Sequence, residues 1–399
     1  MILVLIKIVI LLAGLMTAAA YFVLLERRIA AWVQDRQGPN RVGIPMTKIR
    51  LLGLGQPLAD GLKFIFKEEY TPAHVDRRLF ILAPITILTA ALGVFAVIPF
   101  GSMLPPISSL SEKPIPLIVA PGIDVGMIFV FALSSISVYG VILGGWASNS
   151  KYSFLGGLRS SAQMIAYELP LGLGILGVVL ATGSLRLEEI IEVQVTSGWF
   201  ALTQPLGFLV FVVAGFAEAA RLPFDLPEAE QELIGGYHTE YSGIKLLLFL
   251  VAEFLHMITA SFLIVILFFG GWHLPFGLTG PDEPIGWGFA VFRILVFFFK
   301  ISAVILFFML VRWSWPRFRF DQLMSLAWKV MLPLGIVHLV FVATMAELHH
   351  YYGAQWVARM GGWATWAIAG CAWIFALGAL GLAAACSPII SDNRPHTET

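Results

Sequence analysis

The chain has 399 residues, of which 58% are hydrophobic and 13% charged, and its formal net charge is zero. A mean hydropathy of +0.85 lies outside the range of soluble globular domains of this length. The composition therefore predicts a polytopic membrane protein in a lipid bilayer, with no nucleic-acid partner. Two cysteines, Cys371 and Cys386, are too few for an iron–sulfur cluster or a Cys-type zinc site, so any redox centre is expected in a partner.

Apolar runs of about 20 residues are long enough to cross a bilayer core of about 30 Å. The sequence predicts an all-α fold, a single membrane domain over residues 1–399 with about nine transmembrane helices. The runs cover residues 2–25, 79–99, 122–147, 160–182, 199–216, 243–269, 287–311, 327–346 and 363–386. No small-residue cleavage site precedes the charged cluster that begins at Glu26, so the first run is predicted to be retained.

Residues 56–69 predict a short amphipathic helix in the connection after the first run. Pro57 stands at a favourable first helical position, and Leu58, Leu62, Ile65 and Phe66 fall on one face. The helix is too short to span, so we expect it to lie in the membrane interface. The other interpretation is a helix that simply docks on the bundle.

The connections on one side of the membrane, counted with the adjoining ends of their spans, contain 19 Lys and Arg residues, and the connections on the other side contain 3. Because cytoplasmic loops retain positive charge, this predicts an N-terminus outside and a cytoplasmic C-terminus, in a bacterial cell (inner) membrane. The connection 217–241 then lies on the cytoplasmic side, where its acidity runs against the usual bias.

That connection gathers carboxylates at one point of an otherwise apolar chain. It contains Glu218, Asp225, Glu228, Glu230, Glu232 and Glu240 against the single Arg221, and Glu253 follows in the next apolar run. Carboxylates at this density repel one another, so some retain a proton near neutral pH and the group titrates together. Such a set can take up, transfer or release protons when a nearby charge changes.

Two ionisable residues lie deep within predicted spans, where each costs about 2.5 to 3.5 kcal/mol on insertion scales. Glu168 lies near the middle of the fourth run and is expected to face the bundle interior, neutral or paired. The other interpretation is a carboxylic acid bonded to a carbonyl that Pro170 leaves free. Lys300 lies halfway along the seventh run and is expected to have a carboxylate partner.

Other polar residues in the spans receive structural interpretations. Lys7 and Arg293 lie near span ends and are expected to extend to the interface. His256 and His338 are interpreted as hydrogen-bonded core residues rather than ligands. No metal site is predicted.

Four motifs carry a family resemblance: LLERRIAAWVQDRQGPNRVG from residue 24, QPLADGLKFIFKEE from 56, AEAARLPFDLPEAEQEL from 217 and PRFRFDQLM from 316. In order and spacing they resemble the family of the quinone-site membrane subunit of the proton-pumping NADH-quinone oxidoreductase, respiratory complex I, from about Leu24 to Leu334. The resemblance implies a translocase subunit with no complete catalytic site and no cofactor of its own. It also implies quinone, either ubiquinone or menaquinone, as a shared substrate, with flavin and iron–sulfur clusters in partner subunits.

Matched motif by motif, the resemblance implies two sets of residues. The proton-coupling set is Glu168, Glu218, Asp225, Glu228, Glu230, Glu232, Glu240, Glu253 and Lys300, and the quinone-binding set is Arg27, Arg28, Arg36, Lys63 and Phe224. The implied partners are hydrophilic quinone-site and iron–sulfur subunits, and small membrane subunits that lead to antiporter-like subunits. The run 363–386 is a departure from family members that end after eight spans.

The first hypothesis is that quinone enters between the first span, the surface helix and the sixth span. Its reduction shifts the protonation of the acidic loop, and Glu168 passes the change onward. The alternative is a homologous ion-translocating anchor subunit of a membrane-bound hydrogenase-type complex that uses no quinone. A free-standing transporter would predict discontinuous helices in two repeated halves, and the sequence has no such symmetry.

Overall fold

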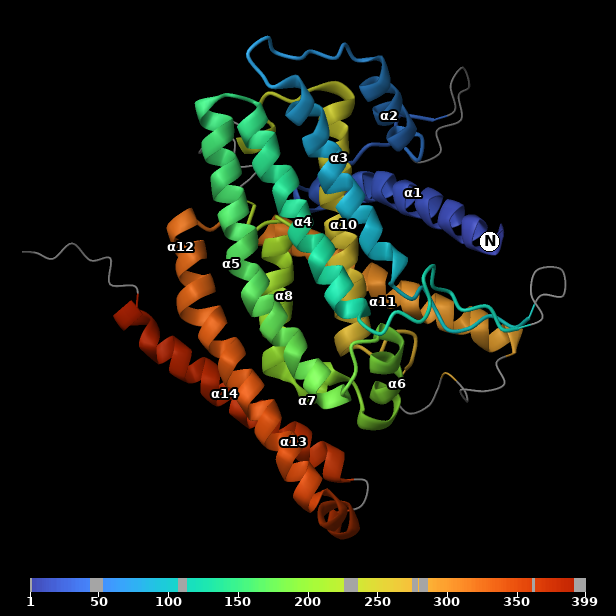
Figure 1. Ribbon diagram of the computed structural model, residues 1–399, viewed down its shortest axis with the longest axis vertical. Helices are drawn as coiled ribbons and strands as arrows, with labels where there is room; N and C mark the ends of the chain where they lie inside the picture. Colours follow the sequence, from blue (N-terminus) through green and yellow to red (C-terminus); the bar gives the residue numbers. More distant parts are fainter. Residues whose placement is uncertain are drawn as a thin grey trace, which may run out of the picture.

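The computed structural model describes residues 2–43, 53–106, 113–225, 236–274, 279, 286–360 and 363–390. Within these ranges the regular elements are helices, apart from an isolated bridge between Leu104 and Ile115 (Figure 1), which confirms the predicted all-α fold. The elements are α1 (Ile2–Val33), α2 (Gln56–Phe66), α3 (Arg77–Gly93), η1 (Val94–Ala96), α4 (Gly126–Ala147), α5 (Lys151–Thr182), α6 (Leu187–Ser197), α7 (Phe200–Thr203), α8 (Pro205–Glu218), η2 (Gly236–His238), α10 (Gly243–Phe268), α11 (Trp287–Ser314), α12 (Phe320–Ser325), η4 (Leu326–Met331), α13 (Leu332–Met360) and α14 (Trp363–Ile390).

Eight helical segments among the described residues are long and apolar enough to cross a membrane, so the chain is a multi-pass membrane protein. They correspond to eight of the nine predicted runs. The remaining run, 199–216, is divided into α7 and the 14-residue α8, because Gln204 leaves the helical conformation (φ −133°). Pro205 has no N–H to donate and therefore begins the new helix.

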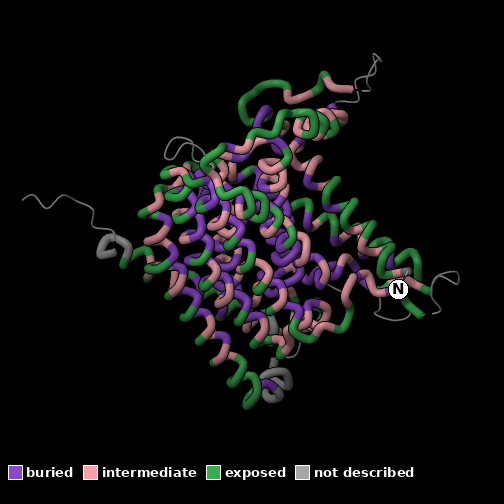
Figure 2. Tube along the Cα trace, turned by 45° about the horizontal axis from the view of Figure 1, so that its top comes forward, coloured by how far each residue is buried: buried purple, intermediate pink, exposed green. Residues whose placement is uncertain are grey.

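Helix α10 is the centre of the bundle. In its most apolar stretch 89% of the residues are buried, against 17% in α1 and 17% in α14. It contacts α1, α2, α3, α8 and α11, and Figure 2 shows buried residues concentrated in the middle of the molecule. The exposed apolar faces of α1 and α14 are suited to contact with lipid.

Helix α1 is longer than the apolar run that predicts it. It continues from residue 25 to Val33, because Ile29, Ala30 and Ala31 still bury an apolar face. The extension places Glu26 and Arg27 on a helix rather than in a loop.

Helix α2 ends at Phe66, three residues before the predicted end, because Lys67 adopts extended backbone (ψ 135°). The predicted apolar face of Leu58, Leu62, Ile65 and Phe66 is between 44% and 82% exposed. A helix docked on the bundle would bury that face, so the exposure favours a helix that inserts it into the membrane interface.

The acidic connection is fixed at both described ends to α5. Gln163 Nε2 donates hydrogen bonds to the carbonyls of Ala217 and Phe224, at 2.9 and 2.7 Å. At the other end, a Cβ on Gly156 would lie 2.7 Å from the backbone of Gly236, so only glycine permits this approach. The two contacts hold both described ends of the acidic connection against the bundle.

Candidate functional site

A cavity of about 410 Å³ opens between α1, α2 and α10, and is called the portal cavity below. Its walls are mostly apolar, with Ala20, Val251 and Phe254 among the lining residues. An ion pair between Arg27 Nη1 and Asp60 Oδ2, 2.7 Å apart, joins α1 to α2 beside it. The volume lies within the range of about 300–1,000 Å³ that holds small organic ligands.

Paired charged residues from α1, α11 and the segment after α8 also line the portal cavity and are called its charged end below. Glu26, only 9% exposed, accepts from Arg221 Nη1 at 3.3 Å and pairs with Arg312. The Arg221 guanidinium also lies 4.2 Å from the centre of the Phe254 ring. Its Nε and Nη2 are buried and have no hydrogen-bond partner among the described residues. The cavity therefore combines apolar walls with charged side chains.

A second, small cavity of about 20 Å³ lies between the end of α8, η2 and α10, and is called the acid cavity below. Glu218, Glu253 and His256 line it together with Tyr237. The Tyr237 hydroxyl donates to Glu253 Oε1 at 3.3 Å. Two carboxylates of the predicted proton-coupling set are thus brought to one buried point.

Neighbouring serines on α4 extend this polar cluster. Ser134 Oγ donates to Glu218, and Ser135 Oγ donates to Glu168 on α5. Glu168 is therefore bonded to a serine hydroxyl rather than to a carbonyl freed by Pro170. Two adjacent residues of α4 therefore bond Glu218 at the end of α8 and Glu168 on α5 inside an apolar bundle.

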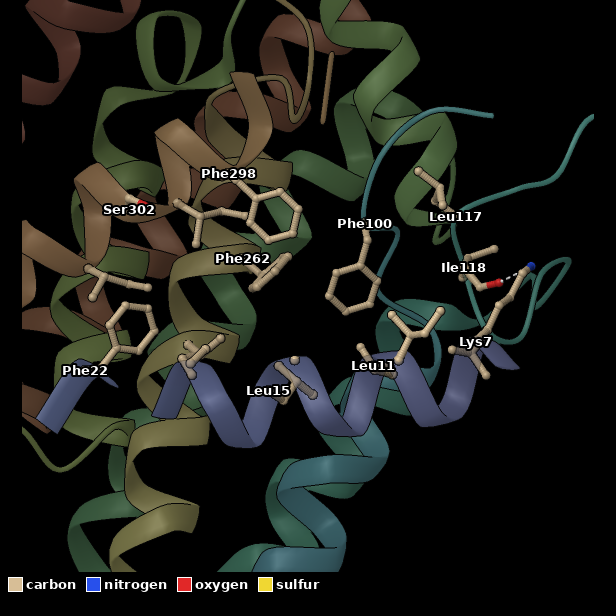
Figure 3. A pocket seen from close by; sticks show the side chains of 17 residues that line it. Lys7, Leu11, Leu15, Phe22, Phe100, Leu117, Ile118, Phe262, Phe298 and Ser302 are labelled. Carbon is tan, nitrogen blue, oxygen red and sulfur yellow. Dashed lines mark hydrogen bonds between the residues drawn. The ribbon is translucent and has the colours of Figure 1, made fainter. Parts of the chain in front are cut away.

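A third cavity, of about 400 Å³, lies between α1, α10 and α11 and is called the apolar cavity (Figure 3). Leu15, Phe262 and Phe298 are among its lining residues, and Lys7 is its one charged lining residue. Lys7 Nζ donates to the carbonyls of Pro116 and Ile118, at 2.7 and 3.0 Å, in the connection between η1 and α4, and its extension to the interface stays a prediction. This cavity lacks the carboxylate and guanidinium groups of the portal cavity.

Comparison with known proteins bears on this arrangement. The model of a family described as NADH dehydrogenase matches residues 6–343. The chain belongs to this family. The match covers α1 to the first part of α13 and leaves out α14.

Curated members of the NADH dehydrogenase family are similar over most of their length. A NADH-quinone oxidoreductase subunit of Leptospira biflexa is 46% identical over 356 residues, 87% of this chain and 94% of the relative. NADH-quinone oxidoreductase subunit 8 of Thermus thermophilus is 46% identical over 342 residues, 86% of each chain. A NADH-quinone oxidoreductase subunit of Protochlamydia amoebophila is 46% identical over 327 residues, 82% of this chain and 92% of the relative. These similarities confirm the resemblance that the four motifs carry.

The predicted quinone-binding residues of this family member do not all lie together. Arg27 and Lys63 line the portal cavity. Arg36 is exposed and bonds Gln34, and Arg28 lies on α1 without lining that cavity. Phe224 is 4% exposed, with its ring 5.5 Å from both Tyr167 and Phe318. For Arg28, Arg36 and Phe224 a contact with quinone stays a prediction.

The predicted proton-coupling residues are also divided. Glu168, Glu218 and Glu253 belong to the polar cluster around the acid cavity and the α4 serines. Asp225 is 2% exposed and pairs with Arg317 at 3.3 Å, and Glu240 is half-buried in the turn before α10. Glu228, Glu230 and Glu232 lie outside the described residues.

Lys300 differs from its expected environment. Its Nζ donates to three backbone carbonyls, those of Phe269, Gly271 and His273, at 2.6 to 2.9 Å, and among the described residues it has no carboxylate partner. These carbonyls belong to the segment that directly follows α10. Lys300 therefore holds the chain after α10, about 20 Å along the helix from Glu253.

The environments of three further polar residues are defined. Arg293 is 2% exposed and donates from Nε to the carbonyl of Thr279 at 3.2 Å, between α10 and α11, and its extension to the interface stays a prediction. His256 and His338 are buried, but the Nε2 of each has no hydrogen-bond partner among the described residues. They are therefore not the satisfied core histidines that were expected.

Five residues of these sites carry no strong signal in the sequence: Glu26, Asp60, Ser134, Ser135 and Arg312. Glu26 stands beside Arg27 in the first motif, and Ser134 and Ser135 interrupt an apolar run. Adjacent hydroxyls in a span are a weak signal, because serine also bonds its own helix, as Ser135 does to the Phe131 carbonyl at 3.0 Å. Within the described residues, no cluster of three or more His, Cys, Asp or Glu side chains could hold a metal ion.

The ion pairs of Glu26 predict a large effect on stability. Glu26→Gln removes the carboxylate that pairs with the buried Arg221 and the half-buried Arg312, and we expect a loss of about 3–5 kcal/mol. Thermal unfolding of the purified complex, followed by loss of this subunit, measures it.

Glu69→Gln is the matched control, because Glu69 is half-exposed and its pair with Lys245, 3.7 Å apart, is worth at most about 1 kcal/mol. Equal stability losses for the two variants would contradict the structural role of Glu26.

Proposed function

We propose that this chain is the membrane subunit of a proton-translocating NADH-quinone oxidoreductase that admits quinone through the portal cavity and couples its reduction to proton movement. The observation that carries the proposal is the portal cavity itself, which lies where the first span, the surface helix and the sixth span meet. The names of the curated relatives support quinone over the hydrogenase-type alternative.

The portal cavity supports quinone entry by its chemistry. A quinone has an apolar isoprenoid tail and a head with two carbonyl oxygens. The exposed apolar face of α2 and the apolar walls of the cavity suit the tail. Arg27 and Lys63, which line the cavity together with Arg221, have N–H donors that suit a carbonyl oxygen. The head would thus pass the charged end of the cavity on its way to a partner subunit.

The carboxylates support coupling. Glu218 lies three residues before Arg221, at the point where α8 ends, so the portal cavity and the acid cavity are connected by one short backbone segment. A change of charge near Arg221 alters the energy of the ionised form of Glu218. The two residues are three positions apart, and the Coulomb energy between nearby charges is large where the dielectric constant is low. Ser134 bonds Glu218 and the adjacent Ser135 bonds Glu168, so both carboxylates contact the same part of α4.

The orientation and the partners belong to the same proposal. The Lys and Arg distribution places α2 and the acidic connection on the cytoplasmic side of a bacterial inner membrane. Hydrophilic partner subunits there would supply the flavin and the iron–sulfur clusters. Small membrane subunits beside Glu168 would carry the response toward antiporter-like subunits.

Narrowing the portal cavity tests quinone entry. Gly61 lines it from α2, and a Cβ there would meet nothing within 4 Å, so Gly61→Leu fills the cavity without a backbone clash. We expect reduction of a long-tailed quinone to fall about tenfold, the effect of about 1.4 kcal/mol. NADH oxidation by a hydrophilic acceptor should be unchanged.

Gly14→Leu is the control, because Gly14 lines the apolar cavity and its Cβ would also meet open space. If Gly14→Leu slows quinone reduction and Gly61→Leu does not, the portal has been assigned to the wrong cavity.

Removing the charge of Glu218 tests coupling. Glu218→Gln retains the shape of the side chain but cannot release a proton, and we expect quinone reduction by the assembled complex to fall at least about tenfold. Glu228→Gln and Glu230→Gln should act in the same direction.

Glu347→Gln, on the exposed face of α13, should have no effect. Normal turnover and normal proton pumping in the Glu218 variant would exclude the coupling role.

A further inference from the structure

The apolar cavity between α1, α10 and α11 has no part in the proposed function, although it is about as large as the portal cavity. Its volume is about 400 Å³. Ile10 on α1 and Phe298 on α11 both line it and are 67% and 44% exposed, so the cavity is open to the apolar surface that the two spans present to lipid. A cavity of this size on a lipid-facing surface is suited to a hydrocarbon ligand.

The apolar cavity follows α1 for much of its length. Figure 3 shows Lys7 and Phe22 at its two ends, and their separation of 15 positions corresponds to about 22 Å along the helix axis. The 32 residues of α1 extend about 48 Å, more than a bilayer core of about 30 Å, and Figure 1 shows α1 inclined to α10. The cavity therefore runs obliquely into the bilayer core from the side on which the N-terminus lies.

The shape and walls of the apolar cavity limit what can occupy it. Leu15, Phe262 and Ile305 are typical of its lining, which is aliphatic and aromatic. A further transmembrane helix is about 10–12 Å across with its side chains, and a volume of about 400 Å³ spread over the length of the cavity has no room for one. A hydrocarbon chain, by contrast, fits both the length and the walls.

Lys7 supplies a positive charge at the N-terminal end of the cavity. Its ammonium group has three N–H donors, of which two bond the carbonyls of Pro116 and Ile118. Those carbonyls are neutral, and among the described residues Lys7 has no carboxylate partner. An ammonium group within a span is costly when no anion compensates it. A phosphate at this end would accept the third hydrogen bond and neutralise the charge.

We propose that the apolar cavity binds an anionic phospholipid with the charge of phosphatidylglycerol, one acyl chain lying between α1 and α11 and the phosphate pairing with Lys7. The net negative charge follows from the lining. A zwitterionic head would bring a second cation beside Lys7, and none of the described lining residues has a carboxylate to receive it. The apolar cavity and the portal cavity share no lining residue, so the inference is independent of quinone entry through the portal.

Photo-crosslinking of the assembled complex in vesicles tests the site. The vesicles consist of phosphatidylcholine with a small fraction of phosphatidylglycerol that has a diazirine in its acyl chain, and peptide mass spectrometry locates the labelled residues. We expect label on lining residues of α1 and α11, among them Leu15 and Phe298. Excess unlabelled phosphatidylglycerol should abolish this label. The same diazirine on phosphatidylcholine should label these residues at least about fivefold less, because that lipid has no net charge.

Two pairs of variants separate binding of the chain from binding of the head. Gly14→Leu fills the cavity, whereas Gly378→Leu makes the same change on the exposed face of α14. Lys7→Met removes the charge, whereas Lys7→Arg retains it. We expect labelling of the cavity to fall at least about fivefold in Gly14→Leu and Lys7→Met, and to be retained in Gly378→Leu and Lys7→Arg. Quinone reduction, which also checks assembly, should be retained in all four.

Equal labelling of the cavity by the two lipid probes, or unchanged labelling in Lys7→Met, would mean ordinary contact with bulk lipid and would overturn the inference. A map of the complex that shows quinone or a partner subunit in the cavity would overturn it as well. Gly61→Leu separates this failure from failure of the proposed function, because it should slow quinone reduction and leave labelling of the apolar cavity unchanged.

Discussion

The pairing of Glu26 with Arg221 and Arg312 is the interaction on which the rest of the arrangement depends. An apolar bundle tolerates buried charges only when they are paired, because an isolated charge in a low-dielectric interior costs several kcal/mol. The three residues come from α1, the segment after α8, and α11. Their pairing therefore fixes the charged end of the portal cavity and the position of the connection that begins at Glu218.

Helix α10 separates the two polar regions and belongs to both. Val251 and Phe254 line the portal cavity, whereas Glu253 and His256 line the acid cavity. These pairs are interleaved in the sequence, so in the proposed function two faces of one central helix would serve entry of the substrate and transfer of the proton. Neighbouring helices cover both faces, in keeping with the burial of α10.

The sequence predicts the elements better than their contacts. Apolar runs predict nine spans, eight of which are helices long enough to cross a membrane, because length and hydrophobicity are local properties. The facial pattern of 56–69 predicts α2 for the same reason. The partners of Glu26 are 195 and 286 residues away, and the partners of Lys300 are backbone carbonyls that have no sequence signature. Likewise, the four motifs identify the family but do not reveal that Ser134 and Ser135 bond two carboxylates from different helices.

A structure of the assembled complex with a long-tailed quinone bound tests the central claim most directly. The account predicts the tail between α1, α2 and α10, with the head directed toward Glu26, Arg221 and Arg312. Quinone in the apolar cavity between α1, α10 and α11, or a path that avoids α2, would contradict it.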